Sequence, residues 1–511
     1  MVEALPYDGG EEDEVRSALR ILDPNRKSDR EYKEGLWDGY RDFNLGGSEI
    51  RFTRGHLGYV QRELRSKGVE YVVELDPLAA EIDTELTDFE PPKPWPGILR
   101  DFTLRDYQVA AIRKVLHHRR GIVYAPPRSG KTAIAIAVAK LLDLPSLLLV
   151  NRAKLIRQHA RVAEEYGLDV QVLGGKGKGK RKERVAITKK HVFATVQTIY
   201  NALKRDDQEI LDWLHRVRVL QGDEIHFLSD SQSWIASVLE TPAIYRVGYS
   251  GTPFRSDDEW DYRDWWLRGC FGPLIFHVDV PFLIEHGFLA PTKVFQVRLP
   301  GNPRLFMVKS WPVAYNVGVV KNKAANRSLA KLAAHAAKCG RTVLLLCYRE
   351  DHGRALLGHL KDLGLNSLFS LGADRCLEID ESDRFVERTY SDKEILQRFE
   401  TGATSRVLVG STIYDQGLDL PFVDTVVMAG GWKAKTTVVQ RAYRCMTATK
   451  WKEQALIIDA YHGFNVILRS HSLKRQQEFS NSILDGGVVR LVTSEQMMRI
   501  LDANQPARLA R

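Results

Sequence analysis

Residues 121–142 read GIVYAPPRSGKTAIAIAVAKLL and decide the fold class of the chain. The apolar segment 121–124 is typical of a strand, and the run 133–142 is typical of a helix. Between them, residues 125–132 match the phosphate-binding loop GxxxxGK[ST], with alanine in place of the first glycine. Backbone N–H groups at the start of such a helix face phosphate oxygens. We therefore expect a strand–loop–helix unit that binds a nucleoside triphosphate.

The polar side chains of this loop have the types that nucleotide chemistry needs. Lys131 is expected to reach the β- and γ-phosphates, and the Thr132 hydroxyl is expected to bind Mg²⁺. Ser129 and Gly130 complete the loop around the phosphates. The predicted ligands of the chain are therefore ATP and Mg²⁺.

A second acidic site follows another apolar segment, 217–220. Asp223 would hold Mg²⁺, mostly through water, and Glu224 would act as general base for the attacking water. A carboxylate pair after a strand is common by itself. Its place about 90 residues after the phosphate loop makes it the predicted catalytic partner of Lys131.

The composition is that of a globular protein. The chain has 511 residues, 44% hydrophobic and 27% charged, which excludes a wholly disordered, collagen-like or coiled-coil protein. The sequence has no apolar run of the roughly 18–20 residues that span a bilayer and no secretory signal pattern at its start. The five cysteines are scattered and lack CxxC spacing. We therefore expect no disulfide framework or zinc site and no membrane association. A cytoplasmic location, bacterial or in a phage-infected cell, is expected.

Charge is unevenly distributed along the chain. Residues 1–88 carry 12 basic and 21 acidic side chains, which leaves a net charge of +18 on the rest of the chain. A nucleic acid is a natural partner for such a basic surface. The segment 174–184, GGKGKGKRKER, has six basic residues and is either a flexible arm on duplex phosphates or a solvated hairpin tip.

Alternating strands and helices predict the domain organisation. Ten apolar segments fall into two groups, 121–124, 146–150, 191–194, 217–220 and 246–249, then 342–348, 367–370, 406–410, 425–429 and 455–459. This alternation is typical of two α/β domains with parallel sheets. The proline-rich segment FEPPKPWPG at 89–97 predicts a stiff linker. The expected units are 1–88, a small N-terminal domain; 89–97, the linker; 98–290 and 291–470, the two α/β domains; and 471–511, a C-terminal extension.

The small N-terminal domain has its own predicted elements. Residues 14–21 and 57–66 are expected to form helices, and 69–75 alternates like a strand. Further along, four aromatic residues lie among arginines and indicate either a base-stacking platform or an amphipathic helix packed beneath Ser250–Thr252. These aromatic residues are Trp260, Tyr262, Trp265 and Trp266.

The tetrapeptide Asp223-Glu-Ile-His226 resembles motif II of superfamily 2 helicases and translocases, and further motifs follow in the family's order. Residues 104–108 resemble the adenine-reading segment, 250–252 motif III, and 440–444 motif VI. The segments 410–411 and 416–419 resemble motif V. The resemblance implies two tandem RecA-like domains and ATP hydrolysis coupled to nucleic-acid unwinding.

The resemblance also implies roles for single residues. Gln108 would read the adenine edge with Arg105 nearby, and Gly417 and Asp419 of motif V would lie at the nucleotide. A second set would couple hydrolysis to the grip on nucleic acid. The members of this coupling set are His226, Ser250 and Thr252.

Motif VI implies a cation on the γ-phosphate in the transition state. Arg444 is the first candidate, Arg441 the second, and Gln440 is expected beside them. Tyr443 stands where the family has glycine, and Thr447 stands where it has the last arginine. Motif VI usually supplies two cationic side chains, and one of them is missing here. Lys450 is the basic residue near enough in sequence to replace it. Arg128 also departs from the family, because many relatives have glycine there.

The family grips one strand by its phosphates, through donors that follow the strands of both sheets. We therefore expect little sequence specificity; each of these residues could instead cap a helix or a turn. The expected contacts are Asn151, Arg152, Thr195, Gln197, Thr198, Tyr348, Arg349, Gly372 and Ser411.

The N-terminal residues narrow the resemblance to one branch. Residues 32–39, 51–52 and 57–61 resemble the N-terminal domain of the UvsW family of phage helicases, and 287–291 resembles this branch and its XPB- and RecG-like relatives. The branch remodels forked and junction DNA in recombination, replication and repair. Arg51 and Arg54, in the basic stretch 51–67, would touch DNA there.

Three functions remain open at this point. The first is a DNA helicase or translocase that unwinds or branch-migrates DNA, for which a single-strand-binding or recombination protein is a candidate partner. The second is an RNA helicase of the same fold. The third is an ATP-gated DNA-binding motor subunit of a restriction or defence complex, suggested by the altered motif VI. No nuclease constellation is evident, so DNA cleavage by this chain is not expected.

Overall fold

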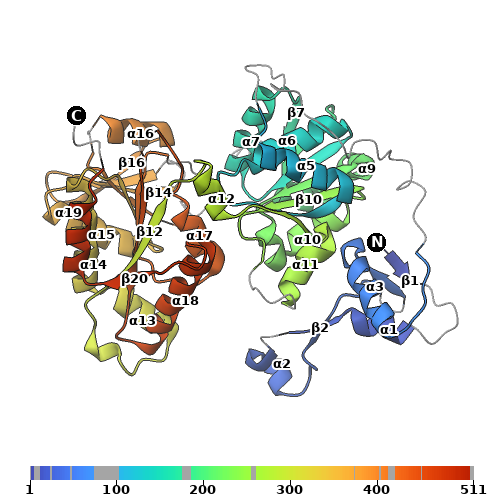
Figure 1. Ribbon diagram of the computed structural model, residues 1–511, viewed down its shortest axis with the longest axis horizontal. Coiled ribbons are helices and arrows are strands. Elements are labelled where there is room, and N and C mark those ends of the chain that lie inside the picture. The colour runs from blue at the N-terminus through green and yellow to red at the C-terminus, as the bar shows by residue number, and fades with distance from the viewer. Residues whose placement is uncertain are drawn as a thin grey trace. The chain divides into compact units, whose positions relative to one another are not determined.

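The computed structural model describes residues 2–4, 12–23, 26–46, 49–73, 103–174, 186–254, 261–372, 375–401, 404–411, 421–450 and 452–506. The chain divides into two compact units, Met1–Val278 and Asp279–Arg511 (Figure 1). The predicted linker 89–97 lies outside the described residues. So do 175–185, Trp260, and Gly417 and Asp419 of motif V.

The first unit begins with a small domain of two short antiparallel strand pairs. β1 (Val2–Ala4) pairs with β4 (Ile50–Phe52), and β2 (Arg20–Leu22) pairs with β3 (Tyr40–Asp42). The helical elements are α1 (Glu12–Ala18), η1 (Arg26–Ser28), α2 (Arg30–Lys33), η2 (Arg54–His56) and α3 (Leu57–Ser66).

Helix α3 has the predicted bounds, and the helix predicted over 14–21 is confirmed in part, but the predicted strand is not found among the described residues. The helix expected over 14–21 ends at Ala18, because the next residues pair with β3 as strand β2. Residues 69–73, the described part of the strand expected over 69–75, form no strand. Both segments are too short for hydrophobic spacing to separate helix from strand.

The rest of the first unit is a seven-stranded parallel sheet in the order β11-β5-β10-β9-β6-β8-β7. Its strands are β5 (Arg120–Tyr124), β6 (Ser146–Val150), β7 (Val170–Leu173), β8 (His191–Thr195), β9 (Val219–Asp223), β10 (Tyr245–Ser250) and β11 (Leu274–His277). The helical elements are α5 (Asp106–His118), α6 (Lys131–Leu142), α7 (Ala153–Glu165), α8 (Val196–Lys204), α9 (Gln208–Arg216), η4 (Ile225–Asp230), α10 (Gln232–Leu239) and α11 (Tyr262–Phe271).

Helices cover both faces of this sheet. Val123 of β5 packs in one core cluster with α5 and α6, whereas its neighbour Ile122 packs in another with α9, α10 and α11. Figure 1 shows α5, α6 and α7 on one side of the sheet and α10 and α11 on the other. The sheet is thus buried on both faces, as parallel sheets are.

The second unit holds a nine-stranded sheet in the order β16-β15-β14-β17-β13-β18-β19-β12-β20. Its strands are β12 (Thr292–Arg298), β13 (Val343–Leu346), β14 (Leu368–Gly372), β15 (Arg375–Ile379), β16 (Phe385–Thr389), β17 (Val407–Gly410), β18 (Thr425–Met428), β19 (Ala455–Tyr461) and β20 (Arg490–Val492). The pairs β14–β15 and β15–β16 are antiparallel, and the others are parallel.

The helical elements of the second unit are α12 (Val280–Glu285), η5 (Pro303–Leu305), α13 (Trp311–Tyr315), η6 (Asn316–Val320), α14 (Lys323–Lys338), α15 (Glu350–Asp362), α16 (Asp392–Glu400), α17 (Lys435–Ala442), α18 (Val466–Ser482) and α19 (Ser494–Ala503). Strand β20 pairs with β12, and Met497 and Leu501 of α19 belong to the main core cluster. Residues after 470 are therefore part of this fold.

Each of the ten predicted strand segments overlaps a strand of the two large sheets, and the α/β fold with two sheets is confirmed. Among the described residues of the two large sheets, the sequence prediction missed six further strands, which are β7, β11, β12, β15, β16 and β20. Most of these lie at or near a sheet edge, where burial on both faces is lost and the apolar run is weaker.

Candidate nucleotide site and nucleic-acid edge

The phosphate loop joins the end of β5 to the start of α6. Gly130, the residue before the helix, has φ 79°, and Arg128 has φ 73°. Glycine adopts this left-handed region freely, whereas a residue with a Cβ pays roughly 1–2 kcal/mol. The structure thus gives a physical reason why glycine is common at the position of Arg128. The Ser129 hydroxyl donates to the Pro126 carbonyl at 2.6 Å and closes the loop.

Residues at the start of helix α5 contact this loop. The Gln108 amide donates to the Ser129 carbonyl at 3.1 Å and accepts from the Arg105 N–H at 2.9 Å. A Cβ on Gly130 would overlap the Gln108 amide nitrogen. Gln108, expected to read adenine, therefore contacts the phosphate loop, and Arg105 contacts Gln108 and Tyr107. Sequence reasoning missed Tyr107, whose hydroxyl donates to the same Ser129 carbonyl at 2.6 Å.

The acidic residues follow β9 at the same edge of the sheet. Glu224 has φ 53°, a strained conformation for a residue with a Cβ, of the kind that clusters at functional sites. Its backbone N–H donates to the Asp223 carboxylate at 3.0 Å. Its Oε1 lies 4.0 Å from Nζ of Lys131, which also donates to the Ala125 carbonyl at 3.1 Å. The fold brings together the three predicted catalytic residues Lys131, Asp223 and Glu224.

A histidine that the sequence analysis did not single out joins the two predicted Mg²⁺ ligands. His159 of α7 lies 3.2 Å from the Thr132 hydroxyl through Nδ1 and 2.8 Å from the Asp223 carboxylate through Nε2. Its exposed fraction is 6%. A lone histidine on a helix carries no motif, so only the tertiary structure reveals this contact.

The predicted coupling residues are also close together. His226 Nδ1 lies 3.0 Å from the Ser250 hydroxyl oxygen, which accepts from the Thr252 N–H at 3.1 Å. His226 Nδ1 is also 3.4 Å from the Glu224 carboxylate. The residues after β9 and β10 thus form one connected network with Glu224.

The predicted nucleic-acid residues of the first unit follow β6 and β8. Asn151 is half-buried, and Arg152 is exposed at the start of α7. Thr195 caps α8, since its hydroxyl accepts from the Thr198 N–H at 3.1 Å and lies 2.7 Å from the Thr198 hydroxyl. Gln197 is exposed and donates to Asn201. Thr195 and Thr198 thus have the capping role that was the alternative to nucleic-acid contact.

The corresponding residues of the second unit lie at the carboxyl edge of its sheet. Tyr348 follows β13, is 41% exposed, and has its ring centroid 4.4 Å from that of Trp432. Arg349 pairs with Asp351 at 2.9 Å. Gly372 ends β14 with φ 104°, and Ser411, at 9% exposure, follows β17.

Motif VI lies on α17 and the turn after it. Gln440 and Arg441 are buried, and a Cβ on Gly430 would lie 3.1 Å from an Arg441 Nη1. Arg444 is half-buried in the turn after the helix. Tyr443, which replaces the family's glycine, is 4% exposed and packs into the unit. The larger side chain is therefore accommodated in the interior.

The N-terminal domain packs on α11. Trp265 is 2% exposed and belongs to the core cluster of that domain with Phe43 and Phe52. His56 Nε2 lies 2.8 Å from the Trp265 carbonyl oxygen. Trp265 is buried and cannot stack on a base, so the base-stacking interpretation of these aromatic residues is wrong for Trp265. The helical alternative is right, but the surface that covers Trp265 is the N-terminal domain.

The two arginines predicted to touch DNA in this domain differ in exposure. Arg51 is exposed and pairs with Glu49 at 2.8 Å. Arg54 is half-buried on η2. Burial, followed by the charges of Arg246 and Arg54, lowers the pKa of Arg120 to about 8. The charge of Arg54 therefore acts on Arg120 at the start of β5.

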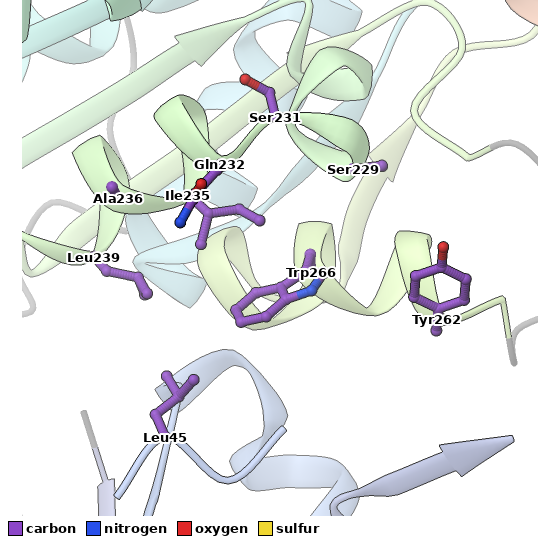
Figure 2. Close-up of a pocket in the computed structure, with 9 residues that line it drawn as sticks. All are labelled: Leu45, Ser229, Ser231, Gln232, Ile235, Ala236, Leu239, Tyr262 and Trp266. Carbon is purple, nitrogen blue, oxygen red and sulfur yellow. The ribbon is translucent and has the colours of Figure 1, made fainter. Parts of the chain in front are cut away.

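An open pocket of about 560 Å³ lies where Leu45 of the N-terminal domain faces α10 and α11. Figure 2 shows Ile235 of α10 and Tyr262 and Trp266 of α11 opposite Leu45. The pocket shares no lining residue with the phosphate loop, so it is a feature of the domain junction.

Comparisons with known proteins agree with the site. Residues 101–255 match the family model described as type III restriction enzyme, res subunit, and residues 366–448 match the helicase conserved C-terminal domain. The DNA 3′-5′ translocase XPB2 of Sulfurisphaera tokodaii is 25% identical over 72% of this chain and 83% of its own length. The chain has the core of a superfamily 2 helicase. It is an ATP-hydrolysing enzyme.

A solved structure with a TM-score above 0.5 shares the fold of this helicase core. Dbp5 of Saccharomyces cerevisiae, solved with RNA and ADP BeF3, aligns over 78% of this chain and 92% of its own, with 16% identity and a TM-score of 0.52. T4 UvsW aligns over 94% of this chain and 95% of its own, with 17% identity and a TM-score of 0.40. Among the described residues, no helix of the core is long and apolar enough to cross a membrane.

The residues of the helicase core fit Mg²⁺ and a nucleoside triphosphate. The Thr132 hydroxyl and the Asp223 carboxylate are linked through one histidine and supply the oxygen ligands that Mg²⁺ prefers. Gly130 gives the loop its left-handed turn before α6, whose first N–H groups suit phosphate oxygens. When bound, Mg²⁺ would offset the negative charge of the phosphates. Lys131 would bind the phosphates, and Glu224 would orient the attacking water and accept its proton.

Proposed function

We propose that this protein is an ATP-driven DNA translocase that unwinds or branch-migrates forked and junction DNA. The observation that carries the proposal is the connected network at the carboxyl edge of the first sheet. It runs from Lys131 through Glu224 to His226 and Ser250. A binding module that does not turn over ATP would not need this catalytic set.

DNA is the proposed substrate for two reasons. The relative from Sulfurisphaera tokodaii is named as a DNA translocase and matches over most of both chains. The chain beyond residue 88 carries a net charge of +18, which suits a polyanion. Exposed Arg152, Gln197, Tyr348 and Arg349 would contact phosphates or bases without reading sequence.

The branched character of the DNA rests on the N-terminal domain. Its resemblance to the UvsW family covers residues 32–61, and the domain is packed against the ATPase domain through α11. DNA bound by Arg51 would therefore be bound by the same compact unit that binds the nucleotide. Recombination, replication or repair would be the setting of such an activity.

The test is the ATPase rate of the full chain with no nucleic acid, single-stranded DNA, duplex, fork, four-way junction and RNA. We expect the largest stimulation with fork or junction DNA and none with Lys131→Ala. Stimulation by RNA alone would instead make the protein an RNA helicase. A low rate that no nucleic acid changes would favour an ATP-gated binding subunit.

A further inference from the structure

His159 lies between two residues that are expected to hold Mg²⁺. Its imidazole lies 3.2 Å from the Thr132 hydroxyl on one side and 2.8 Å from the Asp223 carboxylate on the other. The ring is 6% exposed, so bulk water does not compete for these contacts. One side chain thus connects the phosphate loop to the end of β9.

The Asp223 carboxylate fixes the tautomer of a neutral His159 imidazole. A carboxylate only accepts hydrogen bonds, so Nε2 must carry the proton that is donated to Asp223. In the neutral ring Nδ1 is then an acceptor, and the Thr132 hydroxyl must donate to it. With its hydrogen directed at His159, the hydroxyl presents its remaining lone pairs away from the ring, where a cation can use them.

The position of His159 is set by the packing of α7. Ile156, Ala160 and Ala163 of this helix are buried in a cluster with Ile136 and Ala139 of α6. Helix α6 begins at Lys131 and also carries Thr132. The histidine and the threonine are therefore held on two helices that share one core, which keeps their separation constant.

We propose that His159 is a positioning residue for Mg²⁺. It orients the Thr132 hydroxyl and the Asp223 carboxylate so that both oxygens suit one metal ion bound with the nucleotide. Residues that orient metal ligands in this way typically change metal affinity about 10–100-fold when they are replaced. The inference rests on the proposed ATP-binding function of this site, and it assigns to α7 a role in metal binding.

The test is a titration of the full chain with fluorescent ADP at increasing Mg²⁺ and in excess EDTA. For His159→Ala we expect ADP binding in EDTA to be unchanged and the half-saturating Mg²⁺ concentration to rise about 10–100-fold. His159→Gln keeps a donor for Asp223 and should show a smaller rise. If His159→Ala loses its native melting transition, His159→Gln supplies the test.

The matched control is His191→Ala. His191 is also a buried histidine of the first sheet; it lies 2.8 Å from the Ser146 hydroxyl and 3.6 Å from Asp143, at the amino end of β8. This variant should need the same Mg²⁺ as the wild type. An unchanged Mg²⁺ requirement in folded His159 variants would overturn the inference. Failure of the wild type to bind ADP at all would instead overturn the proposed function.

Discussion

Gly55 of the N-terminal domain and Gly269 of α11 lie with their backbones in direct contact. A Cβ on Gly55 would lie 2.5 Å from the Gly269 carbonyl oxygen and would overlap the Arg268 carbonyl oxygen. A Cβ on Gly269 would lie 2.5 Å from the Thr53 hydroxyl oxygen. The domain junction thus depends on the absence of two side chains.

Replacing Gly55 with alanine should weaken this junction. The added methyl group meets backbone atoms, which cannot rotate away, so a loss of about 1–3 kcal/mol in the free energy of unfolding is expected. Urea unfolding and hydrogen exchange of α11 measure the effect. The control is Gly58→Ala in α3, where a Cβ would meet nothing within 4 Å and alanine favours the helix. Equal stability of the two variants would refute the close contact.

Acid should loosen the same junction through His56. Burial above all, opposed by the hydrogen bond to Trp265 and assisted by the charge of Arg268, lowers the pKa of His56 from 6.5 to about 4. The unfolded chain then binds the proton first, so the contribution of His56 is complete above pH 6.5 and falls as the pH drops toward 4.

The loss from His56 should reach about 2 kcal/mol between pH 7 and pH 5. Urea unfolding of the wild type and of His56→Gln at pH 7 and pH 5 isolates the contribution of His56, because the other buried histidines contribute equally to both proteins. A variant that loses as much stability as the wild type would exclude His56 as the cause.

Removing either catalytic side chain of the first unit should stop turnover but leave DNA binding intact. Lys131→Ala removes the cation at the phosphates, and Glu224→Gln removes the proton acceptor. We expect ATP hydrolysis to fall by at least about 100-fold in each. Steady-state ATPase rates and DNA binding by fluorescence anisotropy check this. Lys140→Ala, on the same helix, should keep its turnover, and normal hydrolysis by Glu224→Gln would show that the general base lies elsewhere.

The two arginines of motif VI should separate into different roles. Arg444 is half-buried in a turn, and its replacement by alanine is expected to slow single-turnover hydrolysis roughly 10³-fold, as for other arginine fingers. Arg441 is 3% exposed, so Arg441→Ala should mainly lower the melting temperature. A wild-type rate in Arg444→Ala would move the finger role to Arg441 or Lys450.

A buried ion pair holds α18 to the second sheet. The Arg475 guanidinium donates to both carboxylate oxygens of Asp459, at 2.9 and 3.0 Å, and Gln296 donates to one of them at 2.8 Å. Arg475→Met leaves an unpaired buried carboxylate and should cost about 3–5 kcal/mol in urea unfolding.

The control for this ion pair is an exposed one. Arg388 pairs with Glu378 at 2.9 Å on the antiparallel edge of the sheet. Arg388→Met should cost at most about 1 kcal/mol, since solvent screens that pair. Similar losses in both variants would mean that burial does not govern the cost.

The features that could be predicted from the sequence are those that depend on a local pattern of residues. The central strands are long apolar runs, and the phosphate loop has a fixed spacing, so both were found. Contacts between distant segments leave no such pattern. His159 and Tyr107 meet the loop only because α7 and α5 pack beside α6. The aromatic residues of α11 predicted a buried helix face but not that the N-terminal domain covers it.

The strained backbone at Arg128 and Glu224 was equally hidden from sequence. Nothing in the letters of PRSGK or DEIH indicates a positive φ, since neither residue is glycine. The surrounding loop and strand impose it through hydrogen bonds that form only in the fold, such as that from the Glu224 N–H to Asp223.

The glycine contact between η2 and α11 also restricts how this protein can diverge. A side chain added at residue 55 meets backbone atoms of Arg268 and Gly269, and one added at residue 269 meets the side chains of Thr53 and His56, so neither position accepts a larger residue without a change in the facing surface. The N-terminal domain and the ATPase domain are therefore expected to evolve together. Replacing either one with the equivalent domain of another protein would require replacing the surface that it contacts.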